Sequence, residues 1–193
     1  MDFELGTYSE KEFKNISLLR QDLSNKEFSN CTFKKCDFSG CKFSGSTFID
    51  CNFQKCNLSN IKVDECSFQN VFFENCKLIG VIFTTINALL VDWKFKNCKI
   101  ELCNFSELDI KNSKFLECTI RKTDFVNANL AKSDFRDSDL QASKFQNTNL
   151  ENANLVGAKN YYIDPTQNKL KKAKFSSPEV LSLLVGFKIE IKN

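Results

Sequence analysis

Large apolar residues recur at every fifth position along most of this chain. From Phe13 to Phe83, fifteen consecutive positions at this spacing are apolar, and thirteen more follow from Phe95 to Leu155. This spacing matches neither the turn of an α-helix, about 3.6 residues, nor the two-residue alternation of a strand, and it differs from the coiled-coil repeat of about 3.5. The chain must therefore repeat a structural unit of five residues.

Two of the five positions in each unit suit an interior. One is the apolar centre, and the other lies two residues before it, is usually small, and holds all ten cysteines. The other three positions are mostly polar and suit solvent. We expect each unit to form one side of a square coil, with four units per coil and coils stacked about 4.8 Å apart. The fifteen and thirteen units then predict an all-β solenoid, a quadrilateral β-helix of about seven coils.

Residues 20 apart should stack on the same side of such a coil. Phe28, Phe48 and Phe68 have this spacing and are all aromatic. In the second run Ile100, Ile120 and Leu140 have it and are all aliphatic, as closely packed sides of matched volume require. This sorting by twenty supports the four-sided geometry independently of the period of five.

The two runs divide the chain into five segments. We expect a lead-in over residues 1–12, repeats over 13–83, a phase break over 84–92, repeats over 93–158, and a cap with dimerisation segment over 159–193. The phase break arises because Phe83 and Phe95 are twelve residues apart, two more than a multiple of five. It is either a partly buried insertion that re-registers the two runs or a projecting contact loop, and the loop reading makes Thr84, Thr85, Asn87 and Asp92 candidate partner contacts.

The C-terminal segment predicts a short α-helix. Ser176 or Ser177 suits the N-cap, Pro178 the first turn, and Gly186 the end of the helix. A solenoid end exposes apolar core, so the helix either caps its own chain or joins two chains. The second reading, which we favour, predicts a homodimer whose interface contains Val180, Leu181, Leu183, Leu184, Phe187, Ile189 and Ile191.

The cysteines and the carboxylates are the remaining candidates for chemistry. Pairs such as Cys36/Cys56 are 20 apart, which would permit a disulfide or a metal site. The same slot holds Ser, Ala and Thr elsewhere, so we interpret the cysteines as buried filler and expect no metal. The acidic residues Asp124, Asp134, Asp137 and Asp139 are interleaved with basic residues, which favours a solvated face, and they are also candidate partner contacts.

Composition argues against several functions. The chain has no histidine, no glycine-rich phosphate motif and only 6 Gly, so we expect neither an enzyme nor a cofactor. Residues 1–158 hold 20 Lys/Arg and 21 Asp/Glu, a net charge of −1, which does not predict direct nucleic-acid binding. The N-terminus has no signal-peptide pattern and no apolar run reaches membrane-spanning length, so we expect a cytoplasmic protein with reduced thiols and no membrane contact.

Units such as Ala128-Asn129-Leu130-Ala131-Lys132 and Ala153-Asn154-Leu155-Val156-Gly157 resemble the A(D/N)LXX signature of pentapeptide-repeat proteins. This resemblance covers about residues 11–158 and implies a right-handed β-helix. The two ends, Tyr8–Phe13 and Tyr162–Ile191, resemble the Qnr-type quinolone-resistance and microcin-immunity branch. That branch implies a dimer that binds type II DNA topoisomerase (gyrase and topoisomerase IV), by DNA mimicry, and protects it from quinolones or a toxin. The alternative is a general protein-interaction scaffold.

Overall fold

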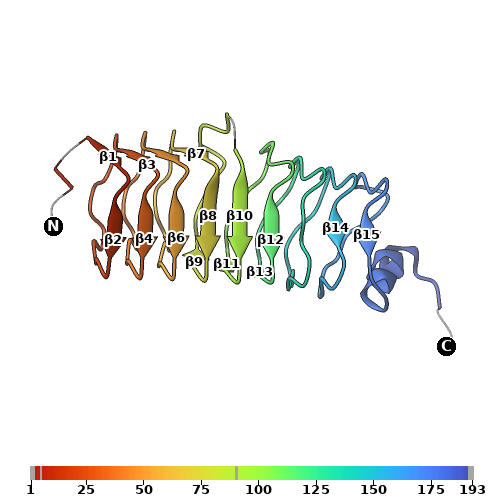
Figure 1. Cartoon of the computed structure of the whole chain (residues 1–193). Helices are drawn as coiled ribbons and strands as arrows, with labels where there is room; N and C mark the ends of the chain where they lie inside the picture. The colour runs from red at the N-terminus through yellow and green to blue at the C-terminus, as the bar shows by residue number, and fades with distance from the viewer. Residues whose placement is uncertain (1–2, 5, 90, 191–193) are drawn as a thin grey trace.

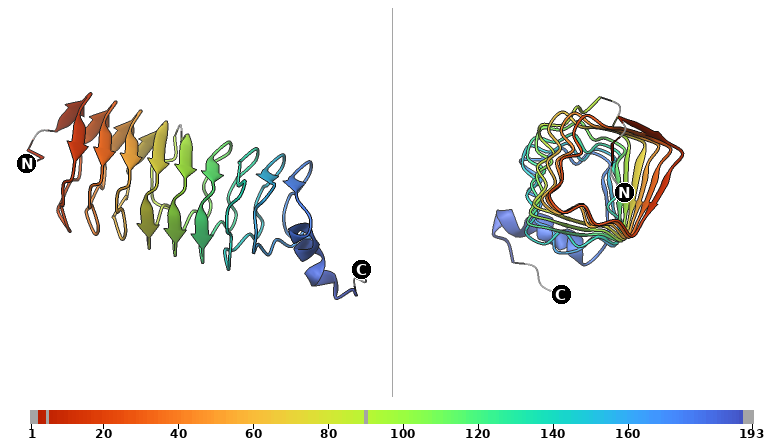
Figure 2. Two further views of the ribbon diagram at one scale, coloured as in Figure 1. Left: turned by 60° about the horizontal axis from the view of Figure 1, so that its bottom comes forward. Right: turned by 90° about the vertical axis from the view of Figure 1, so that its left-hand side faces the viewer.

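The polypeptide winds into a straight rod of stacked square coils. We describe the protein from a computed structural model, which covers residues 3–4, 6–89 and 91–190. Figure 1 shows the coils following one another from the N-terminus to a single helix at the C-terminal end, and Figure 2 shows the square outline when the rod is viewed from its N-terminal end. The predicted all-β solenoid with four sides is confirmed.

The short strands stack in parallel along the sides. Side one carries β1 (Thr7–Ser9), β3 (Glu27–Ser29), β5 (Thr47–Ile49) and β7 (Ser67–Gln69). Side two carries β2 (Glu12–Lys14), β4 (Thr32–Lys34), β6 (Asn52–Gln54), β8 (Val71–Glu74), β10 (Trp93–Lys96) and β12 (Lys114–Leu116), followed by β14 (Asn154–Leu155) and β15 (Lys174–Phe175). Side three carries β9 (Lys77–Ile79), β11 (Lys99–Glu101) and β13 (Thr119–Arg121), and side four is held by single parallel bridges such as Asp22↔Lys42.

The register between coils is 20 residues before the phase break and 22 across it, and after it the register is again 20 except for 18 between Phe145 and Ile163. Phe33 pairs with Phe53, and Phe95 with Phe115, at the shorter offset. Phe73 pairs with Phe95, and Leu78 with Ile100, at the longer one. The two additional residues are therefore absorbed within one coil, and the stacking continues beyond it.

The interior is a set of aromatic and aliphatic ladders. The rings of Phe28 and Phe48 are stacked with centroids 5.0 Å apart, and those of Phe33 and Phe53 are 4.6 Å apart. Rings on adjacent sides meet edge to face, as Phe28 and Phe33 do at 5.4 Å. Both arrangements are the ones that the charge distribution of aromatic rings favours, so the ladders contribute more than area burial alone.

The small inward-facing position of each unit also forms hydrogen bonds to the backbone. The Ser46 hydroxyl donates to the Leu23 carbonyl at 2.8 Å, and the Thr148 hydroxyl donates to the Phe125 carbonyl at 2.8 Å. Cysteine thiols do the same more weakly; Cys31 Sγ lies 3.4 Å from the Tyr8 carbonyl. Each of these donors satisfies a buried carbonyl of the preceding coil, which explains why the slot favours Cys, Ser and Thr.

Most corners of the square are turned by one residue in the left-handed conformation. Asn30, Asn75 and Asn127 have φ of 52°, 54° and 58°, and Gly80 has φ of 67°. Asn and Gly are the residues that reach this region most readily, and they are common at these corners. The five-residue repeat therefore also includes a corner position that favours a left-handed backbone, which the apolar pattern alone does not reveal.

The rod is longer than predicted at both ends. Tyr8 pairs with Phe28 in the first coil, and Phe3 packs over the rings of Tyr8 and Phe13 at 5.4 and 5.0 Å. At the other end Leu155 pairs with Phe175, well beyond residue 158. The rod therefore has about eight turns, where the sequence predicts about seven.

The C-terminal helix η1 (Glu179–Phe187) is a 3₁₀-helix, whereas the sequence predicts an α-helix. Its N-cap is Pro178, and no side chain donates or accepts at that end. The N–H groups of Leu181 and Lys188 donate to carbonyls three residues earlier. The predicted stop at Gly186 is wrong, because the helix passes through it and ends where Lys188 turns left-handed with φ of 53°.

Candidate partner-binding surfaces

The phase break bulges from side one of the rod. Figure 1 shows the segment that precedes β10 rising above the neighbouring coils. Thr84, Thr85, Asn87 and Asp92 are all exposed there, and Leu89 is 68% exposed. Ile86 is buried and Val91 is half-buried, so the segment is anchored in the core on both sides of the bulge.

A tryptophan fills the core beneath this bulge. On side one the ladder of Phe28, Phe48 and Phe68 reaches Ala88, which has no ring to continue it. Trp93 occupies a slot that is elsewhere small, and its ring lies 5.9 Å from Phe68 and 5.2 Å from Phe83. The indole thus supplies the volume that Ala88 leaves empty, which keeps the interior closely packed across the insertion.

Side four carries a second candidate surface beside the break. Ile82 is 54% exposed on this side, and Leu102 is 58% exposed at the corner between sides three and four. A shallow groove runs along side four past Lys42, Lys62 and Ile82. Thr85 belongs to the same groove, where its hydroxyl donates to Asp64 at 2.8 Å, so the groove adjoins the phase break.

The four carboxylates predicted as contacts lie on different sides of the rod. Asp124 is on side four, Asp134 on side two, Asp137 at the next corner, and Asp139 on side three. Three of them form ion pairs with a neighbouring cation: Asp124 with Lys144 at 3.3 Å, Asp134 with Arg136 at 2.7 Å, and Asp139 with Arg121.

Asp139 has a structural role in addition. It accepts hydrogen bonds from Arg121, from Asn160 Nδ2 at 2.8 Å and from the Gln141 N–H at 3.2 Å, and its side chain is only 9% exposed. Burial by itself would raise the pKa of Asp139, but the hydrogen bonds from Asn160 and Arg121 outweigh it and lower that pKa. This carboxylate therefore joins neighbouring coils and is not available as part of an acidic strip.

The C-terminal end of the rod exposes apolar side chains. Leu181, Phe187 and Ile189 are exposed on or after η1, whereas Val180, Leu183 and Leu184 are half-buried. Leu183 packs against the core. Ile191, the last residue predicted for the dimer interface, lies outside the described residues.

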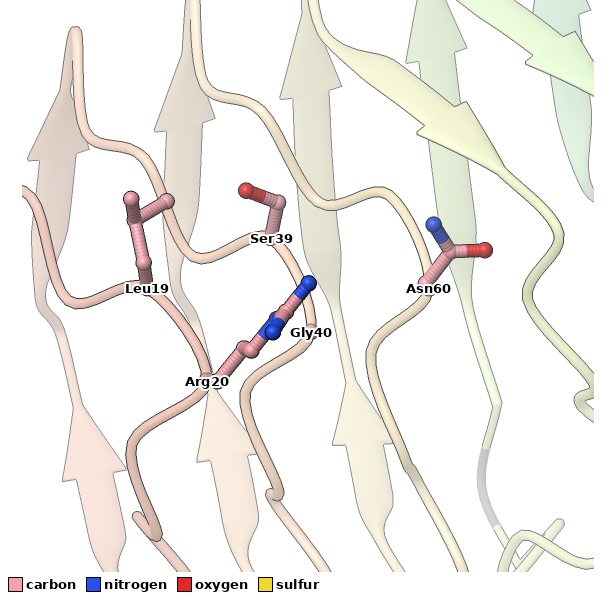
Figure 3. Close-up of a pocket in the computed structure, with 5 residues that line it drawn as sticks. All are labelled: Leu19, Arg20, Ser39, Gly40 and Asn60. Atoms are coloured by element: carbon pink, nitrogen blue, oxygen red, sulfur yellow. The ribbon is translucent and has the colours of Figure 1, made fainter.

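A further hollow lies at the corner between sides three and four, near the N-terminal end. Figure 3 shows it lined by Leu19, Arg20, Ser39, Gly40 and Asn60, with the Arg20 side chain extending beside Gly40. Gly40 has no side chain, and this gives the Arg20 side chain room, because a Cβ at Gly40 would lie 3.0 Å from Arg20 Cγ. The hollow is open and shallow, and it has no convergent set of polar groups that would define a small-molecule site.

The cysteine thiols are buried in the core, where they are poorly reactive at neutral pH. All ten cysteines are free and buried, which agrees with the interpretation of the slot as filler. Burial is the main cause that raises the pKa of Cys51 and of Cys103 to about 12, so almost no thiolate forms at neutral pH. Within the described residues no group of three or more Cys, Asp or Glu side chains is placed to hold a metal.

In the part of the chain that the structure describes, no helix is long and apolar enough to cross a bilayer.

Comparisons with known proteins agree with this architecture. A family model described as "Pentapeptide repeat region" matches residues 26–96 and 88–177. No curated protein sequence matches the chain. A solved structure of a trypsin-treated variant of QnrB1, a plasmid-mediated fluoroquinolone resistance protein, superposes with a TM-score of 0.83 at 17% identity, covering 97% of this chain and 99% of that chain.

Two other solved structures are similar. Full-length QnrB1 has a TM-score of 0.54 at 18% identity, covering 95% of this chain and 100% of that chain. HetL, a pentapeptide repeat protein involved in heterocyst differentiation regulation in the cyanobacterium Nostoc sp., has a TM-score of 0.58 at 15% identity, covering 90% of this chain and 86% of that chain. At these identities the similarity concerns the fold alone.

Proposed function

This chain belongs to the pentapeptide-repeat family, and from that premise we propose that it is a non-enzymatic binding protein whose partner is a type II DNA topoisomerase. In this proposal it protects gyrase or topoisomerase IV from quinolones or from a gyrase-targeting toxin, in the cytoplasm, as a homodimer. The observation that supports it most is the match in fold to QnrB1 along nearly the whole of both chains, with a TM-score of 0.83.

The proposed mechanism depends on shape and on local contacts. A rigid rod with side chains fixed by stacked coils presents a surface that is already organised for binding, so little conformational entropy is lost on association. The proposal does not depend on a continuous acidic surface, because Asp124, Asp134 and Asp139 are neutralised by ion pairs on three different sides. The bulge at the phase break and the apolar C-terminal end are the contacts that we assign to the partner and to the second copy.

The test is a supercoiling assay with purified DNA gyrase and ciprofloxacin. Adding the full chain should restore supercoiling at drug concentrations that otherwise inhibit the enzyme. The chain alone, without drug, should leave the reaction largely unchanged. No recovery over a wide range of protein concentration would exclude the protective role.

A second candidate is a general protein-interaction scaffold without a topoisomerase role. The observation that favours it is that Asp124, Asp134 and Asp139, on three different sides of the later coils, each form an ion pair with a neighbouring cation. Surface plasmon resonance with immobilised gyrase separates the two, because a scaffold of this kind would not bind the enzyme with or without DNA.

A further inference from the structure

The groove on side four combines apolar and basic character. We call it the side-four groove; the residues that matter are Lys42, Lys62, Asp64, Gly80, Ile82 and Thr85. Lys42, Lys62 and Ile82 occupy equivalent positions on successive coils, so they form one column with steps of about 4.8 Å. The column therefore changes from basic to apolar along the rod.

Leu102 lies beside the apolar end of this groove, next to Gly80 along the rod. It occupies the corner one coil beyond Gly80, whose N–H donates to the Glu101 carbonyl at 2.9 Å. Leu102 has φ of 54°, and among the described residues with positive φ it is the only large aliphatic one. It is also 58% exposed. Both its backbone conformation and its exposure disfavour leucine, where Asn or Gly would fit the corner without strain.

Ile82 and Leu102 together make an apolar anchor point. They lie on neighbouring coils and adjacent columns, which places their Cα atoms about 8 Å apart, close enough for one inserted side chain to touch both. Gly80, on the coil before Leu102, has no side chain of its own, and the Asn60 carboxamide lies over it, with Oδ1 2.6 Å from the place of a Cβ. A branched aliphatic or aromatic side chain of another molecule fits such a position.

The basic end of the groove is available for charge pairing. Lys62 forms no ion pair with any described residue, and the Lys42–Asp22 pair is long at 3.8 Å with both side chains about 60% exposed. Asp64 is already engaged by the Thr85 hydroxyl. A nucleic acid is a poorer match than a peptide, because a row of phosphates needs a longer run of cations than Lys42 and Lys62, which Ile82 follows in the same column.

We propose that the side-four groove is the docking site for a segment of the protein partner that carries an apolar side chain followed by carboxylates. The apolar side chain packs between Ile82 and Leu102, and the carboxylates pair with Lys62 and Lys42 one and two coils away. This proposal rests on the binding role proposed above and adds to it the surface used and the chemistry of the segment bound.

The Leu102→Asn variant of the full-length protein tests the proposal, because it separates folding from binding. Asparagine suits the left-handed corner, so the variant should unfold at a higher temperature than the wild type. If Leu102 is a contact, the same variant should bind gyrase about tenfold more weakly. The matched control is Ala142→Asn, at the equivalent corner two coils further along, where φ is 58°; it should gain stability and keep its affinity.

The Ile82→Gln and Lys62→Glu variants test the two ends of the groove in the same assay. Each should weaken gyrase binding by about tenfold, and the effect of Lys62→Glu should diminish at high salt. If gyrase binds Leu102→Asn, Ile82→Gln and Lys62→Glu as tightly as the wild type, the groove proposal is wrong and the topoisomerase proposal stands. If Leu102→Asn instead changes the self-association of the protein without affecting gyrase, the occupant is a second copy and the proposal is also wrong.

A second measurement applies if the wild-type protein does not bind gyrase, in which case the topoisomerase proposal fails. The probe is then the peptide acetyl-Leu-Ser-Asp-Glu-amide, followed by methyl NMR of the full chain. Progressive shifts at the methyl groups of Ile82 and Leu102, absent with a peptide that has lysine in place of Asp and Glu, would support the groove. Unchanged methyl signals up to millimolar peptide would overturn it.

Discussion

Replacing Trp93 tests whether its indole closes the core beneath the phase break. The side chain is 1% exposed, and its ring centroid lies between 5.2 and 6.0 Å from those of four phenylalanines. An indole buries about 200 Å² of surface, which corresponds to about 5 kcal/mol at about 25 cal/mol per Å². Alanine retains part of that burial but leaves a cavity. We therefore expect Trp93→Ala to lower the free energy of unfolding by about 4 kcal/mol.

Trp93→Phe is the informative companion. The indole N–H is buried and has no hydrogen-bond partner among the described residues, which costs about 1–3 kcal/mol. Phenylalanine loses some packing but removes this unpaired donor, so the net change should stay within about 1 kcal/mol. A large loss for alanine and a small one for phenylalanine would identify volume, and not the indole nitrogen, as the requirement.

Urea unfolding followed by far-UV circular dichroism measures both changes, because Trp93 is the only tryptophan and fluorescence would be lost with it. In a solenoid the coils interact with their neighbours only, so Trp93→Ala should also broaden the transition as the two runs begin to unfold separately. A loss below about 1 kcal/mol for Trp93→Ala, or equal losses for both variants, would contradict the packing argument.

Four further predictions concern other parts of the rod. Gly157→Ala should destabilise by about 1–2 kcal/mol in thermal unfolding, because φ is 73° and the new Cβ would overlap Asp137 Oδ1. Asp139→Ala should lower the free energy of unfolding by about 1–3 kcal/mol. Because the pKa of Asp139 is lowered in the folded protein, its stabilising contribution in the wild type should be present above its ordinary pKa of 3.8 and be lost as the pH falls below that value. Native cysteines should not react with Ellman's reagent at pH 8 until the chain is unfolded. Because burial raises the pKa of Cys51 and Cys103 from 9.0 to about 12, the contribution of these two thiols to the free energy of unfolding should be constant below pH 9 and be lost between pH 9 and 12. A chain ending at Phe175 should be monomeric by light scattering if η1 forms the dimer interface, and a dimeric product would place that interface elsewhere.

Much of the fold could be predicted because the side-chain pattern and the backbone pattern share one period. The ladders of Phe28, Phe48 and Phe68 are visible as residues 20 apart, and the structure stacks them as the spacing requires. Phe3 and Tyr8 continue the same spacing before Phe13, so the first coil could also have been found. The last coil was harder to find, because Ile163 pairs with Phe145 at an offset of 18 and breaks the count.

The candidate sites depend on contacts that the period does not contain. Trp93 stands in a slot where the repeat has small residues, and its role becomes clear only when Ala88 is seen to leave a vacancy in the neighbouring ladder. The Arg121–Asp139 ion pair joins residues that are 18 apart, so neither the five-residue repeat nor the 20-residue stacking predicts it. Leu102 could have been singled out from the sequence only with the knowledge that most corners of the square are turned by a left-handed residue.

Because the coils rise uniformly, the number of coils between two points sets their distance along the rod. Leu102 lies about three coils, or about 14 Å, from the C-terminal end at which we propose that two copies meet. Removing one 20-residue block from this interval would bring the side-four groove closer to that end by about 4.8 Å and leave it on the same side. In a twofold pair the separation of the two grooves would shrink by about 10 Å, so the number of coils sets which spacing of binding points on a partner the pair can span.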